Sequence, residues 1–189
     1  MILFVNACVR EKSRTEALSR HLLSKLSGIV QEVKLTDLSF PKADGAFIQK
    51  RDALLFKGEY GDELFAAARD FAAADEIVIA APFWDLSFPA ALKQYFEQIN
   101  VIGITFDYSE SGAPVGLCRA KRLYYVTTAG GPILSEEYGY GYVKALATSF
   151  YGIPDTVLFK AEGLDIAGAD EAAILSEATA RIDEYFAAK

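Results

Sequence analysis

The chain has 189 residues, a length that fits one domain with a sizeable buried core. Hydrophobic residues make up 52% of it and charged residues 24%, which excludes extensive disorder. The formal net charge is −7 and no long basic run is present, so nucleic acid and anionic membranes are not expected as partners. The N-terminal apolar run, MILFVNACV, is too short for a membrane span and resembles no secretory signal, which predicts a cytoplasmic protein.

Apolar strand-like runs alternate with amphipathic helical stretches along the chain, without an internal repeat. We predict strands at residues 2–6, 29–35, 76–80, 123–127 and 156–161. We predict helices at residues 15–26, 62–74, 89–101, 138–150 and 170–187. This alternation predicts a single α/β domain over residues 1–189, with helices on both faces of a parallel sheet. Such sheets bind ligands beyond the carboxyl ends of their strands, so the loops after the first, third and fourth strands are the candidate site.

The loop after the first strand contains CVREKSRT and leads into a predicted helix. Arg10 and Arg14 supply positive charge, and Ser13 and Thr15 supply hydroxyl groups. Because a helix N-terminus presents free N–H groups and the positive end of the helix dipole, the loop is predicted to bind a phosphate. It has no glycine, which excludes both the dinucleotide-binding turn and the P-loop. A capped helix with solvated basic residues is the alternative interpretation.

The same stretch also has the spacing of a Cys-dependent phosphatase loop, because five residues separate Cys8 from Arg14. In low-molecular-weight tyrosine phosphatases the cysteine of such a loop is the nucleophile. Two features disagree with that interpretation: the loop lacks glycine, and Asp155 follows a proline instead of preceding one. Cys8 is therefore expected to be a small buried residue.

Two further loops follow predicted central strands. After the third strand comes APFWDLSFPAALKQYFEQI, whose aromatic residues ahead of a helix start suit a flat, partly apolar ligand. The fourth strand ends in VTTAGG, and the pair Gly130 and Gly131 would let the backbone approach a ligand closely. A hydrophobic cap on the sheet and a simple tight turn are the respective alternatives.

The chain resembles the flavodoxin-like FMN-dependent NAD(P)H:quinone oxidoreductases, a family that includes the FMN-dependent azoreductases. The matching stretches, in order along most of the chain, are SRT, APFWDLSFPAALKQYFEQI, ITFDYSESGAPVGL, VTTAGG and FYGIPDTVLFKAEGL. The resemblance implies a flavodoxin-like three-layer sandwich with a five-stranded parallel sheet in the order 2-1-3-4-5. It also implies FMN as cofactor, NADH or NADPH as electron donor, and a homodimer whose partner subunit contributes to the flavin site.

The resemblance also implies roles for individual residues. The FMN phosphate would be held by Arg10, Ser13, Arg14 and Thr15. The flavin ring would be contacted by Pro82, Phe83, Trp84, Asp85 and Leu86, and its pyrimidine end by Thr128, Ala129, Gly130 and Gly131. The substrate pocket would be lined by Phe106 and Tyr108. Asp85 departs from the family, in which asparagine is usual, and a carboxylate beside the ring would disfavour an anionic reduced flavin.

The implied activity is two-electron reduction of quinones, with azo compounds as further acceptors, by ping-pong hydride transfer through the flavin. No side chain has to act as a nucleophile. No metal site is predicted, because His21 is the only histidine and has no ligand cluster around it. Three alternative functions stay open: a flavodoxin-type electron carrier, a flavin-fold protein with a degenerate site, and a phosphatase that uses Cys8 and Arg14.

Overall fold

The computed structural model describes residues 1–188; Lys189, the last residue of the predicted domain, lies outside them. Its centre is a parallel sheet of five strands: β1 (Ile2–Asn6), β2 (Val30–Lys34), β3 (Glu76–Ala80), β6 (Arg122–Thr128) and β7 (Asp155–Ala161). They pair in the order β2-β1-β3-β6-β7. The predicted flavodoxin-like arrangement is confirmed, since β6 and β7 are the fourth and fifth strands of this sheet.

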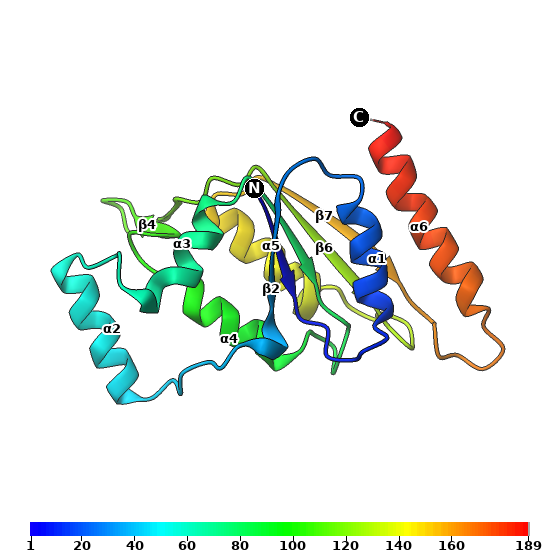
Figure 1. Cartoon of the computed structure of the whole chain (residues 1–189), viewed down its shortest axis with the longest axis horizontal. Coiled ribbons are helices and arrows are strands. Elements are labelled where there is room, and N and C mark those ends of the chain that lie inside the picture. Colours follow the sequence, from blue (N-terminus) through cyan, green and yellow to red (C-terminus); the bar gives the residue numbers. More distant parts are fainter. Residues whose placement is uncertain (189) are drawn as a thin grey trace.

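Helices cover both faces of the sheet (Figure 1). On one face lie α1 (Arg14–Leu23) and α6 (Glu171–Ala187), and on the other α3 (Ala66–Ala73), α4 (Ala90–Ile99) and α5 (Tyr142–Leu146). Alternate residues of β1 join different apolar clusters, because successive side chains of a strand point to opposite faces. Phe4 packs with α1 and α6, and its neighbour Leu3 packs on the opposite side.

Short segments complete the predicted elements. The predicted helix at 138–150 is a run of three segments, in which α5 is flanked by the wider π-type turns η3 (Glu137–Gly141) and η4 (Ala147–Tyr151). Single 3₁₀ turns, η1 (Leu35–Asp37) and η2 (Glu63–Phe65), follow β2 and precede α3. The helix predicted to end at residue 26 ends at Leu23 instead.

One helix, α2 (Gly45–Lys57), was not predicted from the sequence. The Asp44 side chain caps its start, and Gly58 ends it in the left-handed conformation at φ 71°. Its apolar residues form no continuous buried face: the Leu54 side chain is buried, whereas Phe56 is 95% exposed. Without an amphipathic pattern, only the capping residues indicate a helix here, and Figure 1 shows it at the periphery.

A two-stranded antiparallel hairpin, β4 (Phe106–Tyr108) and β5 (Pro114–Gly116), is also absent from the sequence prediction. It lies on η4, with the Phe106 and Phe150 ring centroids 4.8 Å apart. A Cβ on Gly116 would lie 2.0 Å from the backbone nitrogen of Gly152, so this contact requires glycine. Its three-residue strands are too short for alternation to predict them.

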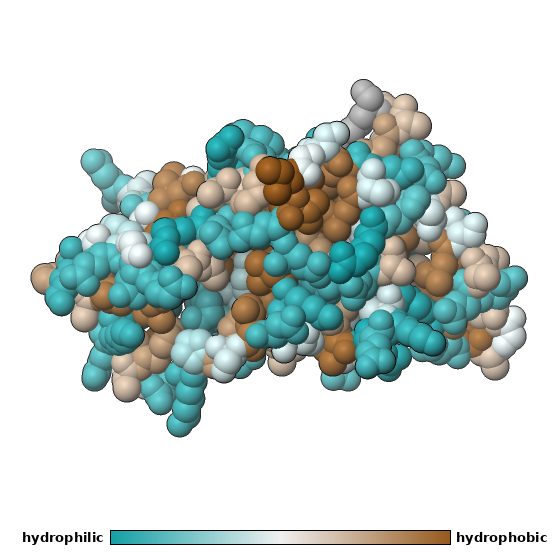
Figure 2. Space-filling model, in the orientation of Figure 1, coloured by the Kyte–Doolittle hydropathy of each residue, from teal (hydrophilic) through white to brown (hydrophobic). Residues whose placement is uncertain are grey.

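The surface in Figure 2 is mostly hydrophilic, with apolar groups gathered near the end of the sheet that carries the N-terminus. Exposed apolar residues there include Ile29 and Val30 at the start of the edge strand β2. Within residues 1–188, every helix is too short or too polar to cross a lipid bilayer.

Two buried tyrosines in the larger apolar cluster make opposite stability predictions. The Tyr151 hydroxyl donates a hydrogen bond of 2.7 Å to Asn100 Oδ1, whereas the buried Tyr95 hydroxyl has no partner among the described residues. Tyr95→Phe should therefore leave the free energy of unfolding unchanged or raise it. Tyr151→Phe should lower it by about 1 kcal/mol, because the hydrogen bond is lost. Chemical denaturation of both variants checks the pair, and equal losses would contradict the assignment of Tyr95 as unpaired.

Candidate functional site

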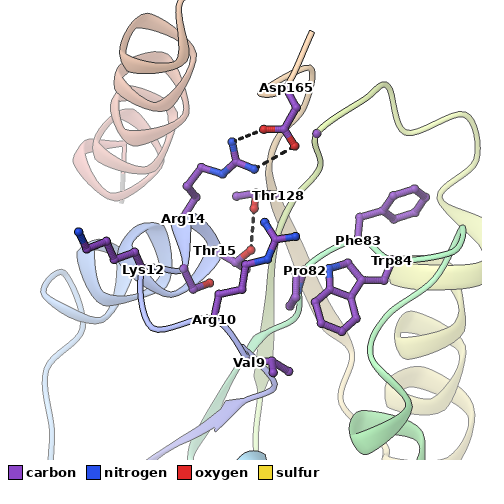
Figure 3. Close-up of a pocket in the computed structure, with 12 residues that line it drawn as sticks. Val9, Arg10, Lys12, Arg14, Thr15, Pro82, Phe83, Trp84, Thr128 and Asp165 are labelled. Carbon is purple, nitrogen blue, oxygen red and sulfur yellow. Dashed lines mark hydrogen bonds and ion pairs between the residues drawn. The ribbon is translucent and has the colours of Figure 1, made fainter.

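The loops after β1, β3 and β6 meet at one edge of the sheet and enclose an open pocket of about 190 Å³. The strand register explains the meeting point: Asn6 lies opposite Ala80, and Ala80 lies opposite Val126, so the three strands end almost level. Figure 3 shows the pocket, with the β1 loop on one side and the β3 loop on the other. A fourth segment, the turn after β7, contributes Asp165.

The β1 loop presents a row of unused backbone donors. The N–H groups of residues 9–15 have no hydrogen-bond partner in the part of the chain that the structure describes. The Ser13 side chain caps α1 by accepting a hydrogen bond of 3.2 Å from the N–H of Glu16. Free N–H groups at a helix N-terminus attract negative charge, so this loop can bind an anion.

The basic side chains of this loop differ in whether they are free. Arg10 and Lys12 form no ion pair with any described residue, and Figure 3 shows the Arg10 guanidinium over the centre of the pocket. Arg14, in contrast, is paired: its two Nη atoms lie 2.8 and 3.3 Å from the Asp165 carboxylate oxygens. Glu171 lies 3.5 Å from the same guanidinium. Arg10 and Lys12 therefore provide the unneutralised positive charge of the pocket.

The Arg14 and Asp165 pair perturbs both groups. The hydrogen bonds and charge of Arg14 lower the pKa of Asp165, and the hydrogen bond from Asp165 raises the pKa of Arg14. Asp165 was not predicted from the sequence, since it lies 151 residues from Arg14 and belongs to no recognisable motif. Only the tertiary structure brings it to the loop.

A buried hydroxyl pair links the end of the β1 loop to the sheet. Thr15 Oγ1 and Thr128 Oγ1 lie 2.6 Å apart, and both threonines are buried. The contact joins the first turn of α1 to the last residue of β6. Two predicted site residues from distant loops are thus held in direct contact.

The β3 loop makes a tight turn with strained backbone. Trp84 and Ser87 exchange two backbone hydrogen bonds of 3.1 and 2.7 Å. The two central residues, Asp85 and Leu86, have left-handed φ angles of 50° and 66°. Such turns prefer asparagine and glycine, and leucine in this region is strained. The N–H groups of Asp85 and Leu86 are left without a partner among residues 1–188, so both can donate to a ligand.

The β3 loop also forms an apolar wall of the pocket. Pro82, Phe83 and Trp84 line it, and Figure 3 shows these three on the opposite side of the pocket from Lys12 and Arg14. A backbone hydrogen bond of 3.0 Å from Phe83 to Thr128 fixes this loop against the end of β6. A flat apolar group can therefore lie between the β1 loop and the β3 loop.

The glycine pair after β6 serves two different purposes. A Cβ on Gly130 would lie 2.2 Å from Asp165 Oδ2, so glycine at this position makes room for the carboxylate. Nothing lies within 4 Å of a Cβ built on Gly131, and the N–H groups of both glycines are free of partners within the described chain. Ala129, by comparison, continues the ladder by donating to Ala161 at 2.9 Å.

The two predicted substrate-pocket residues do not line this pocket in a single chain. Phe106 is buried against Phe150 and also contacts Tyr108, with ring centroids 5.6 Å apart. Tyr108 is about half exposed. Their proposed role therefore depends on a second subunit.

Cys8 lies beneath the loop and is 2% exposed. Its Sγ lies 3.9 Å from the carbonyl oxygen of Ala80, and burial raises the pKa of the thiol to about 11. A nucleophilic cysteine needs the opposite shift, because the thiolate is the reactive form. This environment matches the buried residue that the sequence predicts.

Comparisons with known proteins identify the family of the chain. A family model described as the flavodoxin-like fold matches residues 1–186. A Clostridium acetobutylicum protein named FMN-dependent NADH:quinone oxidoreductase 2 is 35% identical over 185 residues, covering 92% of each chain. The FMN-dependent NADH:quinone oxidoreductase of Coprothermobacter proteolyticus is 33% identical over 188 residues, covering 94% of this chain and 93% of that protein.

Solved structures show the same fold. An azoreductase from Bacillus anthracis superposes with a TM-score of 0.81 at 24% identity, covering 98% of this chain and 97% of the other. An FMN-dependent NADH-azoreductase from the same species, solved in complex with FMN, gives a TM-score of 0.81 at 23% identity with the same coverage. Since the family model and the relatives extend over nearly the whole sequence, the chain belongs to the flavodoxin-like family of FMN-dependent NADH:quinone oxidoreductases.

Proposed function

We propose that this protein binds FMN in the pocket between the β1, β3 and β6 loops and uses NADH to reduce quinones, with azo compounds as further acceptors. The observation that carries the proposal is the row of unpartnered N–H groups at residues 9–15 beside the unpaired Arg10. An anion site of this kind, next to an apolar wall, suits a phosphorylated aromatic molecule.

The residues present fit FMN at both of its ends. A phosphate monoester carries up to two negative charges, which the free loop amides, Arg10 and Lys12 can balance. For the ring, the pocket offers the apolar wall that includes Trp84. Polar atoms of the ring would find free backbone donors on Asp85, Leu86, Gly130 and Gly131.

When bound, FMN supplies the capacity to accept and donate a hydride. The chain supplies orientation, because Trp84 and the tight turn after it limit how a ring can lie. Its free N–H groups also stabilise negative charge near the ring without having to reorganise. No nucleophilic side chain is required, which agrees with the burial of Cys8.

NADH is proposed as the donor because the similar curated relatives are named for NADH. A cytoplasmic location is part of the same proposal. It is supported by the two cysteines, Cys8 and Cys118, which are both free thiols.

A homodimer is proposed because exposed apolar residues cluster on and beside the hairpin. Tyr108 and Val115 are 49% and 46% exposed, and Ile102 and Leu117 are exposed to a similar degree. Apolar groups gathered in one segment favour a protein contact, and a symmetric pair would bury the same segment of both chains. The family resemblance places the segment around Tyr108 toward a partner subunit's flavin site, and that is the position proposed for it here.

The first prediction from the proposed function concerns Arg10. Arg10→Gln should weaken FMN binding about tenfold to a hundredfold, because it removes a charge-assisted contact to the phosphate. Binding of riboflavin, which lacks the phosphate, should change little. Quenching of flavin fluorescence measures both affinities, and Lys50→Gln on the peripheral helix α2 is the control for loss of a positive charge.

The wild-type protein provides the broader test. FMN at 100 times its dissociation constant should stabilise the fold by about 2.7 kcal/mol, and the purified complex should be yellow. Protein that stays colourless and whose melting temperature ignores FMN would refute the proposed function.

The second prediction concerns association. Val115→Glu should convert a dimer to a monomer and reduce quinone turnover, because a charge would be buried at the contact. Light scattering at micromolar concentration measures the mass, and Ile29→Glu, at an exposed apolar residue beside β2, is the matched control. A wild-type monomer with full quinone turnover would rule out a shared site.

The third prediction concerns the Cys8 thiol. With its pKa raised to about 11, the thiolate fraction falls as pH drops below that value. Iodoacetamide at pH 8 should therefore modify Cys8 more than about a hundredfold more slowly than an exposed thiol. Mass spectrometry follows the modification, and denatured protein is the control. Rapid modification of folded protein at neutral pH would instead support the phosphatase alternative.

A further inference from the structure

One residue of the pocket has the wrong charge for an anion site. Asp165 lines the pocket, yet its other charged members are Arg10, Lys12 and Arg14. The Asp165 side chain is 62% exposed, so burial does not hold it in place. A carboxylate here repels any negatively charged ligand of the loop.

Backbone hydrogen bonds hold Asp165 close to the β1 loop. The turn after β7 lies beside the residues that follow β6. The N–H of Leu164 donates to the carbonyl oxygen of Ala129 at 3.2 Å, and the N–H of Asp165 donates to that of Gly130 at 2.8 Å. The absence of a side chain on Gly130 leaves the space that the carboxylate occupies. The position of Asp165 is therefore set by the ends of β6 and β7 and by the lack of a side chain at Gly130.

Asp165 pairs with the Arg14 guanidinium, which could otherwise bind a phosphate. Both Nη atoms of Arg14 bond to its carboxylate oxygens in the bidentate manner that arginine also uses for phosphate. Figure 3 shows the pair above Arg10, at the rim of the same pocket. The carboxylate thus takes the place of one anionic group at this edge of the site.

We infer that Asp165 competes with the phosphate of the cofactor for Arg14 and thereby weakens cofactor binding. This inference rests on the proposed function, because it takes FMN as the ligand of the loop. Arg10 and the free amides hold the phosphate, while Arg14 stays neutralised until Asp165 releases it. Asp165 is then a determinant of cofactor affinity, and it keeps FMN exchangeable.

The opposite role for Asp165 makes the opposite prediction. If the carboxylate oriented Arg14 toward the phosphate, its removal would weaken FMN binding. Under competition, removal frees a bidentate cation and lifts a repulsion, so binding becomes tighter. The sign of the change in affinity therefore separates the two roles.

The test measures FMN and riboflavin affinity by fluorescence quenching in wild type and in Asp165→Asn. We expect the affinity for FMN to be higher in the variant by a factor of about three or more, and the affinity for riboflavin to be unchanged. Asp183→Asn, a change on α6 that removes an acidic partner of Lys25 and His21, is the matched control for net charge and should have no effect on FMN binding. Asp165→Ser serves as a second variant, and thermal melting verifies that each protein is folded.

A double-mutant cycle tests the route through Arg14. In an Arg14→Gln background, Asp165→Asn should tighten FMN binding less than it does in the wild type, because the contested guanidinium is gone and only the relief of repulsion is left. Weaker or unchanged FMN binding in Asp165→Asn, or a gain in Arg14→Gln as large as in the wild type, would overturn the inference. A wild-type protein that binds no FMN would instead refute the proposed function itself, so the two failures are distinguishable.

Discussion

The parallel register of β1, β3 and β6 is the constraint on which the site depends. Because Asn6, Ala80 and Val126 lie in adjacent register positions, three loops from distant parts of the sequence begin at one edge of the sheet. Backbone hydrogen bonds and side-chain packing on both faces hold this register, since a one-residue slip would turn every buried side chain to the other face. The β1 loop, the apolar wall and the glycine pair are therefore positioned by the core and not by contacts with a ligand.

The electrostatics of the pocket result from a balance within an acidic chain. Positive charge is concentrated where amides of the α1 N-terminus are also free, so a protein of net charge −7 still offers an anion site. Most basic residues elsewhere are paired, such as Arg20 with Glu16 and Glu32. Within the pocket the same pairing reaches Arg14 but not Arg10. The loop therefore combines one available guanidinium with one that an acidic neighbour holds.

The turn after β3 shows how local strain and function coincide. Asp85 and Leu86 adopt left-handed φ angles that a different turn sequence would accept more easily. Fixed hydrogen bonds between Trp84 and Ser87, and a bond from the Ser87 hydroxyl to the Tyr138 carbonyl oxygen, keep the turn in this form. The result is a pair of outward N–H donors on a rigid support, which is useful for a ligand and costly for the free chain.

The strand and helix alternation and the three loops of the pocket were predictable from the sequence, because unbroken apolar strands and helix-start residues are local signals. The order of the sheet came from the family resemblance. It did not reveal α2, whose apolar residues form no buried stripe, or the hairpin, whose strands are too short for a periodic pattern. Which of the pocket's cations are free depends on tertiary contacts. Asp165 reaches Arg14 across 151 residues through the β6 and β7 strand ends and the space at Gly130, and no local pattern encodes a contact of that range.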